Sequence, residues 1–110
     1  MKAKVVLCKC PRSKGLSGIR MEERGGDWVR TWAFKISETR AKSENYGREK
    51  VSGTMKPTPE YPGCPYCGAV EIIQCPCGKM SCYHGGLEVV CPWCEVGGRV
   101  QAADKLEFEV

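Results

Sequence analysis

Cysteines are the residues of this chain whose number and spacing could do chemistry. Nine occur among 110 residues, and three short segments have the form of a metal-binding knuckle: CPYCG at 64–68, CGKMSC at 77–82 and CPWC at 91–94. Two thiolates separated by two residues in a tight turn can both reach one tetrahedral ion at about 2.3 Å, and glycine or proline permits such a turn. The spacing therefore predicts metal sites made of thiolates.

The second and third knuckles are spaced as one metal site. Cys77 and Cys82 enclose one loop, and Cys91 and Cys94 enclose another. Residues 83–90 join the two loops, which is the arrangement of a small zinc ribbon. We therefore predict that these four cysteines bind one ion.

The first knuckle needs partners from elsewhere in the chain. Cys64 and Cys67 leave three cysteines unassigned, at positions 8, 10 and 75. We favour Cys10, which opens a tight turn, and Cys75, which follows the knuckle by one short strand; Cys8 then has no metal role. The alternative pairs Cys8 with Cys10, because thiols two residues apart on a strand point to one face.

This assignment predicts two ions and gives the neighbouring Cys75 and Cys77 to different ions. Thiolates suit zinc, with iron second, and are poor ligands for oxygen-preferring ions. His84, the single histidine, is expected to be an ordinary loop residue, with metal ligation as the less favoured interpretation. A zinc ion with four cysteine ligands has no open coordination position, so we expect a structural role and no enzyme activity.

Strands are predicted to position these cysteines. Residues 4–8 form a short β-branched run, and residues 18–36 have the pattern of a β-hairpin with Gly25 and Gly26 at its turn. On its second arm, large apolar side chains fall on one face that Arg30 interrupts: Trp28, Trp32, Phe34 and Ile36. We expect these side chains in the core, and the alternative is a base-stacking or peptide-binding platform.

A short helix and a connector follow the hairpin. Residues 37–47 are predicted to form the helix, with Ser37 as its N-cap and Gly47 just past its end. The segment 53–63 contains three prolines, so it can be neither regular helix nor central strand. Strand-like segments come after it: 69–75, 87–91, 97–102 and 105–110.

These elements predict a small β-rich, metal-stabilised domain, zinc-ribbon-like, with antiparallel β-hairpins and one short α-helix. We expect a single domain over residues 1–110. Its parts would be the hairpin and helix at 1–52, the proline-rich connector at 53–63 and a double zinc-knuckle ribbon at 64–110. A chain this short buries proportionately little surface, so metal ions would add to its stability.

Charge is unevenly distributed along the chain. Residues 1–63 contain 14 Lys and Arg against 7 Asp and Glu, a net charge of +7, whereas residues 64–110 contain 3 against 6, a net charge of −3. A basic half suits nucleic acid, although interspersed glutamates dilute it. The N-terminus has no signal-peptide core, and no stretch approaches the roughly 18 to 20 apolar residues of a membrane span. We therefore expect a cytoplasmic protein, in which cysteines at this spacing are metal ligands or redox pairs.

The tetrapeptide CPYC at 64–67 has a second interpretation, because glutaredoxins carry it as their dithiol active site. In that setting the motif should open a helix whose N-terminus lowers the pKa of the thiol. Here the proline-rich connector precedes it and the β-prone AVEIIQ follows it. A dithiol redox protein is therefore the lesser alternative.

The segments TWAFKI, YPGCPYCG, CGKMSCYHGG and CPWC, in this order, resemble the TerY-C metal-binding domain. In that family a cysteine-rich, zinc-ribbon-like module lies at the C-terminus of von Willebrand A-type proteins encoded with bacterial tellurite-resistance and stress genes. The resemblance runs from Cys10 to about Gly98. It implies metal-ligand roles for six positions: Cys64, Cys67, Cys77, Cys82, Cys91 and Cys94.

The resemblance also implies a regulatory or assembly module near phosphorylation-linked stress signalling, and not a catalyst. We therefore expect a zinc-binding module that binds a protein partner, such as a von Willebrand A-type or phosphorylation-signalling protein. The alternative from another class is a nucleic-acid-binding zinc ribbon, whose affinity would fall steeply with salt.

Overall fold

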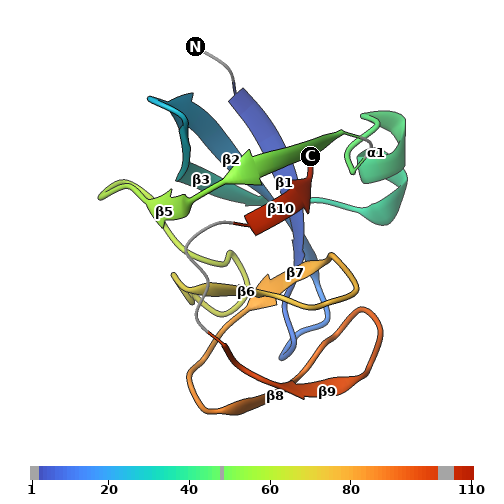
Figure 1. Cartoon of the computed structure of the whole chain (residues 1–110). Helices are drawn as coiled ribbons and strands as arrows, with labels where there is room; N and C mark the ends of the chain where they lie inside the picture. The colour runs from blue at the N-terminus through green and yellow to red at the C-terminus, as the bar shows by residue number, and fades with distance from the viewer. Residues whose placement is uncertain (1–2, 48, 102–105) are drawn as a thin grey trace.

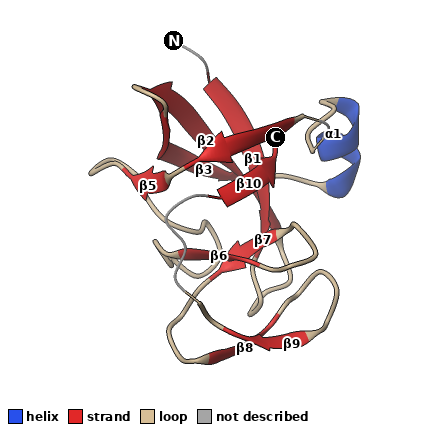
Figure 2. Cartoon of the chain, in the orientation of Figure 1, coloured by secondary structure: helices blue, strands red, loops and turns tan. Residues whose placement is uncertain are grey.

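Strands make up most of the regular structure, as predicted. The structure is a computed structural model that describes residues 3–47, 49–101 and 106–110. Its elements in chain order are β1 (Ala3–Lys9), β2 (Leu16–Arg24), β3 (Asp27–Lys35), α1 (Glu38–Ser43), β4 (Lys50–Gly53), β5 (Met55–Pro57), β6 (Ile72–Gln74), β7 (Met80–Cys82), β8 (Glu88–Val90), β9 (Gly97–Arg99) and β10 (Leu106–Glu109). Figure 2 shows α1 as the helix of the described part, and the prediction of a β-rich domain with one minor helix is confirmed.

One sheet contains strands from both halves of the chain. Its strand order is β5-β3-β2-β1-β7-β6, so β7 of the cysteine-rich half hydrogen-bonds with β1 of the basic half. The pairs β1–β2, β2–β3 and β6–β7 are antiparallel, whereas β1–β7 and β3–β5 are parallel. The predicted hairpin is β2–β3, and its turn residues Gly25 and Gly26 both have positive φ, 58° and 87°. A two-residue turn with two positive φ angles matches the twist of a hairpin.

The short helix begins where the sequence predicts. The Ser37 side chain accepts a hydrogen bond from the backbone N–H of Arg40 at 3.1 Å, which is the bond of an N-cap. Helical structure ends at Ser43, and the chain then turns through Asn45 and Gly47, which have φ of 60° and 86°. The helix is therefore shorter than the predicted 37–47. In the described residues no helix has the length and apolar character needed to cross a membrane.

A β-bulge in β3 changes which side chains are buried. Arg20 pairs with Trp32 and Met21 pairs with Arg30, so Thr31 has no partner of its own. The Thr31 hydroxyl donates to the backbone carbonyl of Arg20 at 3.2 Å. Arg30 is buried on the same face as Trp28, but the extra residue reverses the alternation beyond it, so Trp32 is 54% exposed on the other face. The predicted common face of Trp28, Trp32 and Phe34 is therefore wrong.

A second layer covers the inner face of β1–β3. There the small sheet of β4 and β10 lies across the large sheet (Figure 1). Phe108 of β10 is 1% exposed and packs edge-to-face on Trp28, with 6.3 Å between the ring centroids. Val6, Ile19 and Met21 belong to the same buried cluster. This layer places the core on one side of β1–β3.

The opposite face, called the outer face below, carries Val5, Leu7, Phe34 and Trp32, with the exposed Arg20 between Val5 and Trp32. The first three are half-buried. The Phe34 ring and Val5 lie over Gly18, since a Cβ at Gly18 would come within 2.6 Å of the ring and 3.0 Å of Val5. The outer face thus has an apolar patch from which Trp32 projects, and the Arg20–Glu22 ion pair lies beside it.

The remaining predicted strands are found but are shorter than predicted, and the connector contains a further strand. The connector 53–63 contributes β5, which lies at the edge of the large sheet, where proline is tolerated. Residues 69–75 contribute β6, and β8 pairs with β9 as a separate hairpin. Residues 105–110 contribute β10, although positions 102–105 lie outside the described residues.

Candidate metal centres

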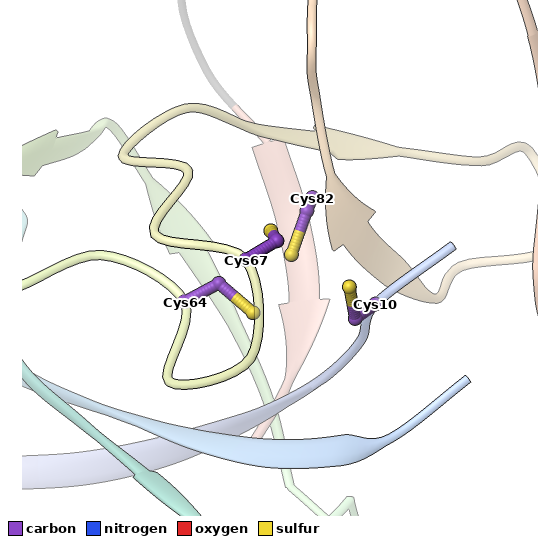
Figure 3. Close-up of side chains that lie close together, drawn as sticks. All are labelled: Cys10, Cys64, Cys67 and Cys82. Atoms are coloured by element: carbon purple, nitrogen blue, oxygen red, sulfur yellow. The ribbon is translucent and has the colours of Figure 1, made fainter. Parts of the chain in front are cut away.

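Eight cysteines form two groups of four in the folded chain. The first group, called centre 1, contains Cys10, Cys64, Cys67 and Cys82. The second group, called centre 2, contains Cys75, Cys77, Cys91 and Cys94. Within each group all sulfur atoms lie within 4.8 Å of one another. Figure 3 shows the side chains of centre 1 turned toward one another from three separate segments.

The predicted division of the cysteines between two sites is wrong for Cys75 and Cys82. Cys82 was expected with Cys77, and it lies instead in centre 1. Cys75 was expected with Cys64 and Cys67, and it lies instead in centre 2. The neighbours Cys75 and Cys77 therefore belong to the same group, whereas Cys77 and Cys82 belong to different groups.

Strand pairing explains this exchange. Cys75 and Cys77 lie in the turn between β6 and β7, whereas Cys82 ends β7, opposite Ile72 of β6. The parallel register of β1 and β7 pairs Cys8 with Met80 and Lys9 with Ser81. One residue further on, the chain after β1 brings Cys10 level with Cys82. The segment CGKMSC is thus half of a β-hairpin and not a knuckle.

Three cysteines open the same kind of turn: Cys10, Cys64 and Cys91. In each turn the cysteine N–H donates to the carbonyl five residues later, and the cysteine carbonyl accepts from the N–H four residues later. That fourth residue has positive φ every time, 63° at Lys14, 77° at Gly68 and 62° at Glu95. The turn tightens the chain, so that two nearby thiols can face one ion.

Cys75 opens a shortened form of this turn. Its N–H donates to the Lys79 carbonyl at 3.0 Å, and its carbonyl accepts from the Gly78 N–H at 2.8 Å. Proline follows the cysteine in all four turns, at positions 11, 65, 76 and 92. The Cys-Pro dipeptide was therefore a signal in the sequence that marks the leading cysteine of each turn. The fold places two of these turns at each centre.

The sulfur spacing suits a tetrahedral ion. A tetrahedron with metal–sulfur bonds of about 2.3 Å has sulfur–sulfur edges of about 3.8 Å. In centre 2 the sulfurs of Cys75 and Cys94 are 3.6 Å apart, and those of Cys77 and Cys91 are 3.9 Å apart. Both groups therefore could hold a thiophilic metal ion.

The protein by itself does not favour four thiolates in centre 1. Burial raises the pKa of Cys64, and it raises the pKa of Cys67 to about 12. A hydrogen bond with Cys8, together with burial, raises the pKa of Cys82. Burial also acts to raise the pKa of Cys10, but hydrogen bonds from the Ser13 side chain and from nearby backbone hold it at about 7. Four negative sulfurs at this place therefore require a cation.

Centre 2 shows the same contrast between its thiols. Burial acts to raise the pKa of Cys91, but backbone N–H groups of Cys94 and Trp93 bring it below its ordinary value. A backbone hydrogen bond from Cys77 acts to lower the pKa of Cys75, yet burial and protons shared with neighbouring thiols raise it to about 12. Cys91 therefore forms a thiolate readily, whereas Cys75 needs a metal ion to do so.

The two centres differ in exposure. In centre 1, Cys10, Cys64 and Cys82 are buried, whereas in centre 2 Cys77 and Cys94 are exposed. A cleft of about 540 Å³ between β6 and the β8–β9 hairpin reaches the cysteines of centre 2. Solvent therefore has direct access to centre 2 but not to most of centre 1.

His84 and Cys8 lie beside centre 1 and outside both groups of four. His84 is exposed, as expected of a loop residue, and its Nε2 is 3.1 Å from the Cys67 sulfur. Sequence reasoning weighed ligation against a plain loop position and missed this contact to a group member. Cys8 is 1% exposed and belongs to neither group, so the alternative set built on it is not the one that the fold assembles.

Comparison with known proteins agrees with this geometry. The model of the TerY-C metal binding domain matches residues 2–110, which is nearly the whole chain. Neither the curated proteins nor the solved structures provide a match. Two four-cysteine groups are what a metal-binding domain requires. The chain therefore belongs to the TerY-C metal binding domain family.

Proposed function

We propose that this protein holds two zinc ions as structural centres and acts as a non-catalytic module that binds another protein. The observation that carries the proposal is the gathering of eight of the nine cysteines into two groups of four. Four thiolates favour zinc, with iron second, and leave no coordination position open for a substrate. The cysteines would hold the ion, and the buried surroundings of centre 1 would exclude water from it.

Elemental mass spectrometry of protein purified without chelator tests the metal content. We expect a ratio near two zinc ions per chain. A ratio near one would mean that one group does not hold an ion, and iron in place of zinc would show as coloured thiolate absorption. No bound metal in freshly purified protein would contradict the proposal.

The outer face supports protein binding. It has an apolar patch beside Arg20, and its Trp32 side chain is 54% exposed, which is unusual for a residue of this size. At one end of it Lys9 and Lys79 both approach the Trp93 ring at 5.4 Å. An apolar surface bordered by lysines suits a protein partner with apolar and acidic side chains.

Site-specific photo-crosslinking in cells tests this surface. A crosslinker at position 32 should capture a partner protein, and one at Leu87, which is 69% exposed and precedes β8 outside the large sheet, should not. The captured protein is then purified, and its affinity for the wild type is compared with that for Trp32→Ser. A partner that binds both proteins equally would remove the outer face from the proposal.

The remaining expectations belong to this proposal. The family resemblance favours a von Willebrand A-type or phosphorylation-signalling partner in the bacterial cytoplasm, in a stress response of the tellurite-resistance type.

Nucleic acid is the alternative partner, and binding to mixed oligonucleotides at about 50 mM salt that weakens steeply with added salt would favour it. The dithiol alternative predicts a reactive thiol in the native protein. We expect instead that Cys64 and Cys67 resist alkylation until a chelator is added.

A further inference from the structure

Arg30 is a buried positive charge that forms none of the ion pairs found among the described residues. It is 2% exposed, and its Nε has no hydrogen-bond acceptor. Its guanidinium lies over the ring of Tyr61, with 5.3 Å from Cζ to the ring centroid. A buried cation is costly unless negative charge compensates it, so the surroundings of Arg30 should contain that charge.

The side chains around Arg30 lead to centre 1. Tyr61, which stacks with Arg30, lies three residues before Cys64 and packs in the same buried cluster as Cys64, Cys82 and Cys8. Burial lowers the pKa of Arg30, and negative charge on Tyr61, Glu71 or Cys8 acts against that shift. Burial raises the pKa of Tyr61, and Cys8, Cys82 and Cys64 raise it further. Arg30, Tyr61 and the thiols thus share one electrostatic environment.

A loaded centre 1 would supply the missing negative charge. A divalent ion with four thiolate ligands carries a formal charge of about −2. Three of the four cysteines of centre 1 are buried, so water screens that charge poorly. Centre 2 has two exposed cysteines, and water can screen its charge. The buried centre therefore needs a protein cation, and the exposed one does not.

We propose that Arg30 is the buried counter-cation of metal-loaded centre 1 and slows the loss of the ion from that centre. The inference rests on the proposed metal binding. Arg30 is not a ligand; it stabilises the four thiolates through the buried cluster that contains Tyr61. The effect is confined to centre 1, because Tyr61, over which Arg30 lies, packs in the cluster with Cys64 and Cys82, and that cluster contains no cysteine of centre 2.

Site-resolved alkylation of the full metal-loaded chain tests this inference. Wild type, Arg30→Met and Arg30→Lys are each mixed with a chelator and an alkylating reagent, and peptide mass spectrometry follows each cysteine. For Arg30→Met we expect the cysteines of centre 1 to react about 10 to 100 times faster, the usual range for groups that support metal ligands from outside the coordination shell. Those of centre 2 should react at the wild-type rate. Arg30→Lys keeps the charge and should stay within a few-fold of wild type.

Arg20→Met is the matched control. Arg20 lies on the other side of the sheet, is exposed and pairs with Glu22 at 2.7 Å, so its loss changes the net charge equally without affecting the buried cluster. We expect wild-type rates at both centres. Equal acceleration at both centres in Arg30→Met, or none at centre 1, would overturn the proposal. If Arg30→Met does not fold, Arg30→Gln is compared with Arg30→Lys, and equal rates in that pair would overturn it as well.

Cys8 belongs to the same buried cluster but is not a member of centre 1, so it is a competing partner for Arg30. The measurement is therefore repeated in the Cys8→Ala background, where the effect of Arg30→Met should persist. Its disappearance there would show that Arg30 serves Cys8 and would overturn the proposal. The metal content of the wild type separates the two levels of inference: without metal at centre 1 the proposed function fails, whereas two ions with unchanged rates in Arg30→Met refute Arg30 alone.

Discussion

At the scale of residues, each cysteine turn depends on one residue with positive φ, and this residue lets the chain turn tightly beside the centre. Lys14 and Glu95 adopt positive φ without being glycine, which L-residues do at a cost of roughly 1–2 kcal/mol. The hydrogen bonds of each turn offset that strain. Gly63, just before Cys64, has φ of 83° and also lies against backbone, since a Cβ there would be 2.5 Å from the Gly68 carbonyl oxygen.

Gly63→Ala should therefore destabilise the metal-loaded protein more than Gly68→Ala. Gly68 has φ of 77° but open space around it, so its substitution should cost only the backbone strain of roughly 1–2 kcal/mol. Gly63→Ala adds a clash with backbone atoms that cannot move aside. Urea denaturation of both variants measures the difference, and equal losses would show that the chain around Gly63 relaxes freely.

The assignment of Cys75 and Cys82 to different centres is also tested by single substitutions. In Cys82→Ser, the remaining thiols of centre 1 should become reactive toward an alkylating reagent, while centre 2 stays protected. Cys75→Ser should do the reverse. Each variant serves as the control for the other. If Cys64 and Cys67 became reactive in Cys75→Ser, the grouping of Cys75 with Cys64 and Cys67 that spacing predicts would be correct.

At the scale of elements, the bulge in β3 separates two tryptophans that the alternation of the sequence places together. Trp28 is 3% exposed and packs on Phe108, whereas Trp32 projects from the outer face. One extra residue at Thr31 is enough to put the two tryptophans on opposite faces, because side chains alternate between faces with a period of two. The same strand thus supplies both the core and an exposed surface.

Trp28→Ala and Trp32→Ala should accordingly differ in stability. Removing the buried indole of Trp28 should cost about 3–5 kcal/mol, because it leaves a cavity. Removing the exposed indole of Trp32 should cost about 1 kcal/mol or less. Denaturant midpoints of the two metal-loaded variants give the comparison, and a loss at Trp32 as large as that at Trp28 would mean that the outer face is covered.

At the scale of the whole molecule, the two centres connect different amounts of chain. Centre 1 links the turn after β1, the segment 64–67 and the end of β7, and so bridges the basic half and the cysteine-rich half. Centre 2 links only the turn between β6 and β7 with the turn between β8 and β9. Closing a longer loop restricts the unfolded chain more, so centre 1 should matter more for global stability.

Loss of centre 1 should therefore unfold the molecule, and loss of centre 2 should open it locally. We expect Cys67→Ser to lose amide protection throughout β1–β3 and several kcal/mol of unfolding free energy. Cys94→Ser should lose protection in β8 and β9 while β1–β3 keep theirs. Hydrogen exchange measured by mass spectrometry distinguishes the two outcomes, and global loss in Cys94→Ser would show that the centres fold as one unit.

Much of the local structure could be predicted from the sequence. The hairpin turn at Gly25 and Gly26, the cap at Ser37 and the predominance of strands all depend on neighbouring residues, because backbone preference and side-chain period are local properties. Cysteine spacing, together with the tight turn expected after Cys10, named the same eight cysteines that lie in the two groups of four, while spacing alone left the set with Cys8 open.

Only the tertiary structure decided which cysteines share a centre. Cys82 joins Cys10 because β7 pairs in parallel with β1, and that pairing joins residues far apart in the chain. The bulge at Thr31 and the buried Arg30 likewise depend on contacts between strands and with the β4–β10 layer. Spacing along the chain describes how two thiols can meet in one turn, but strand register determines which turns meet in space.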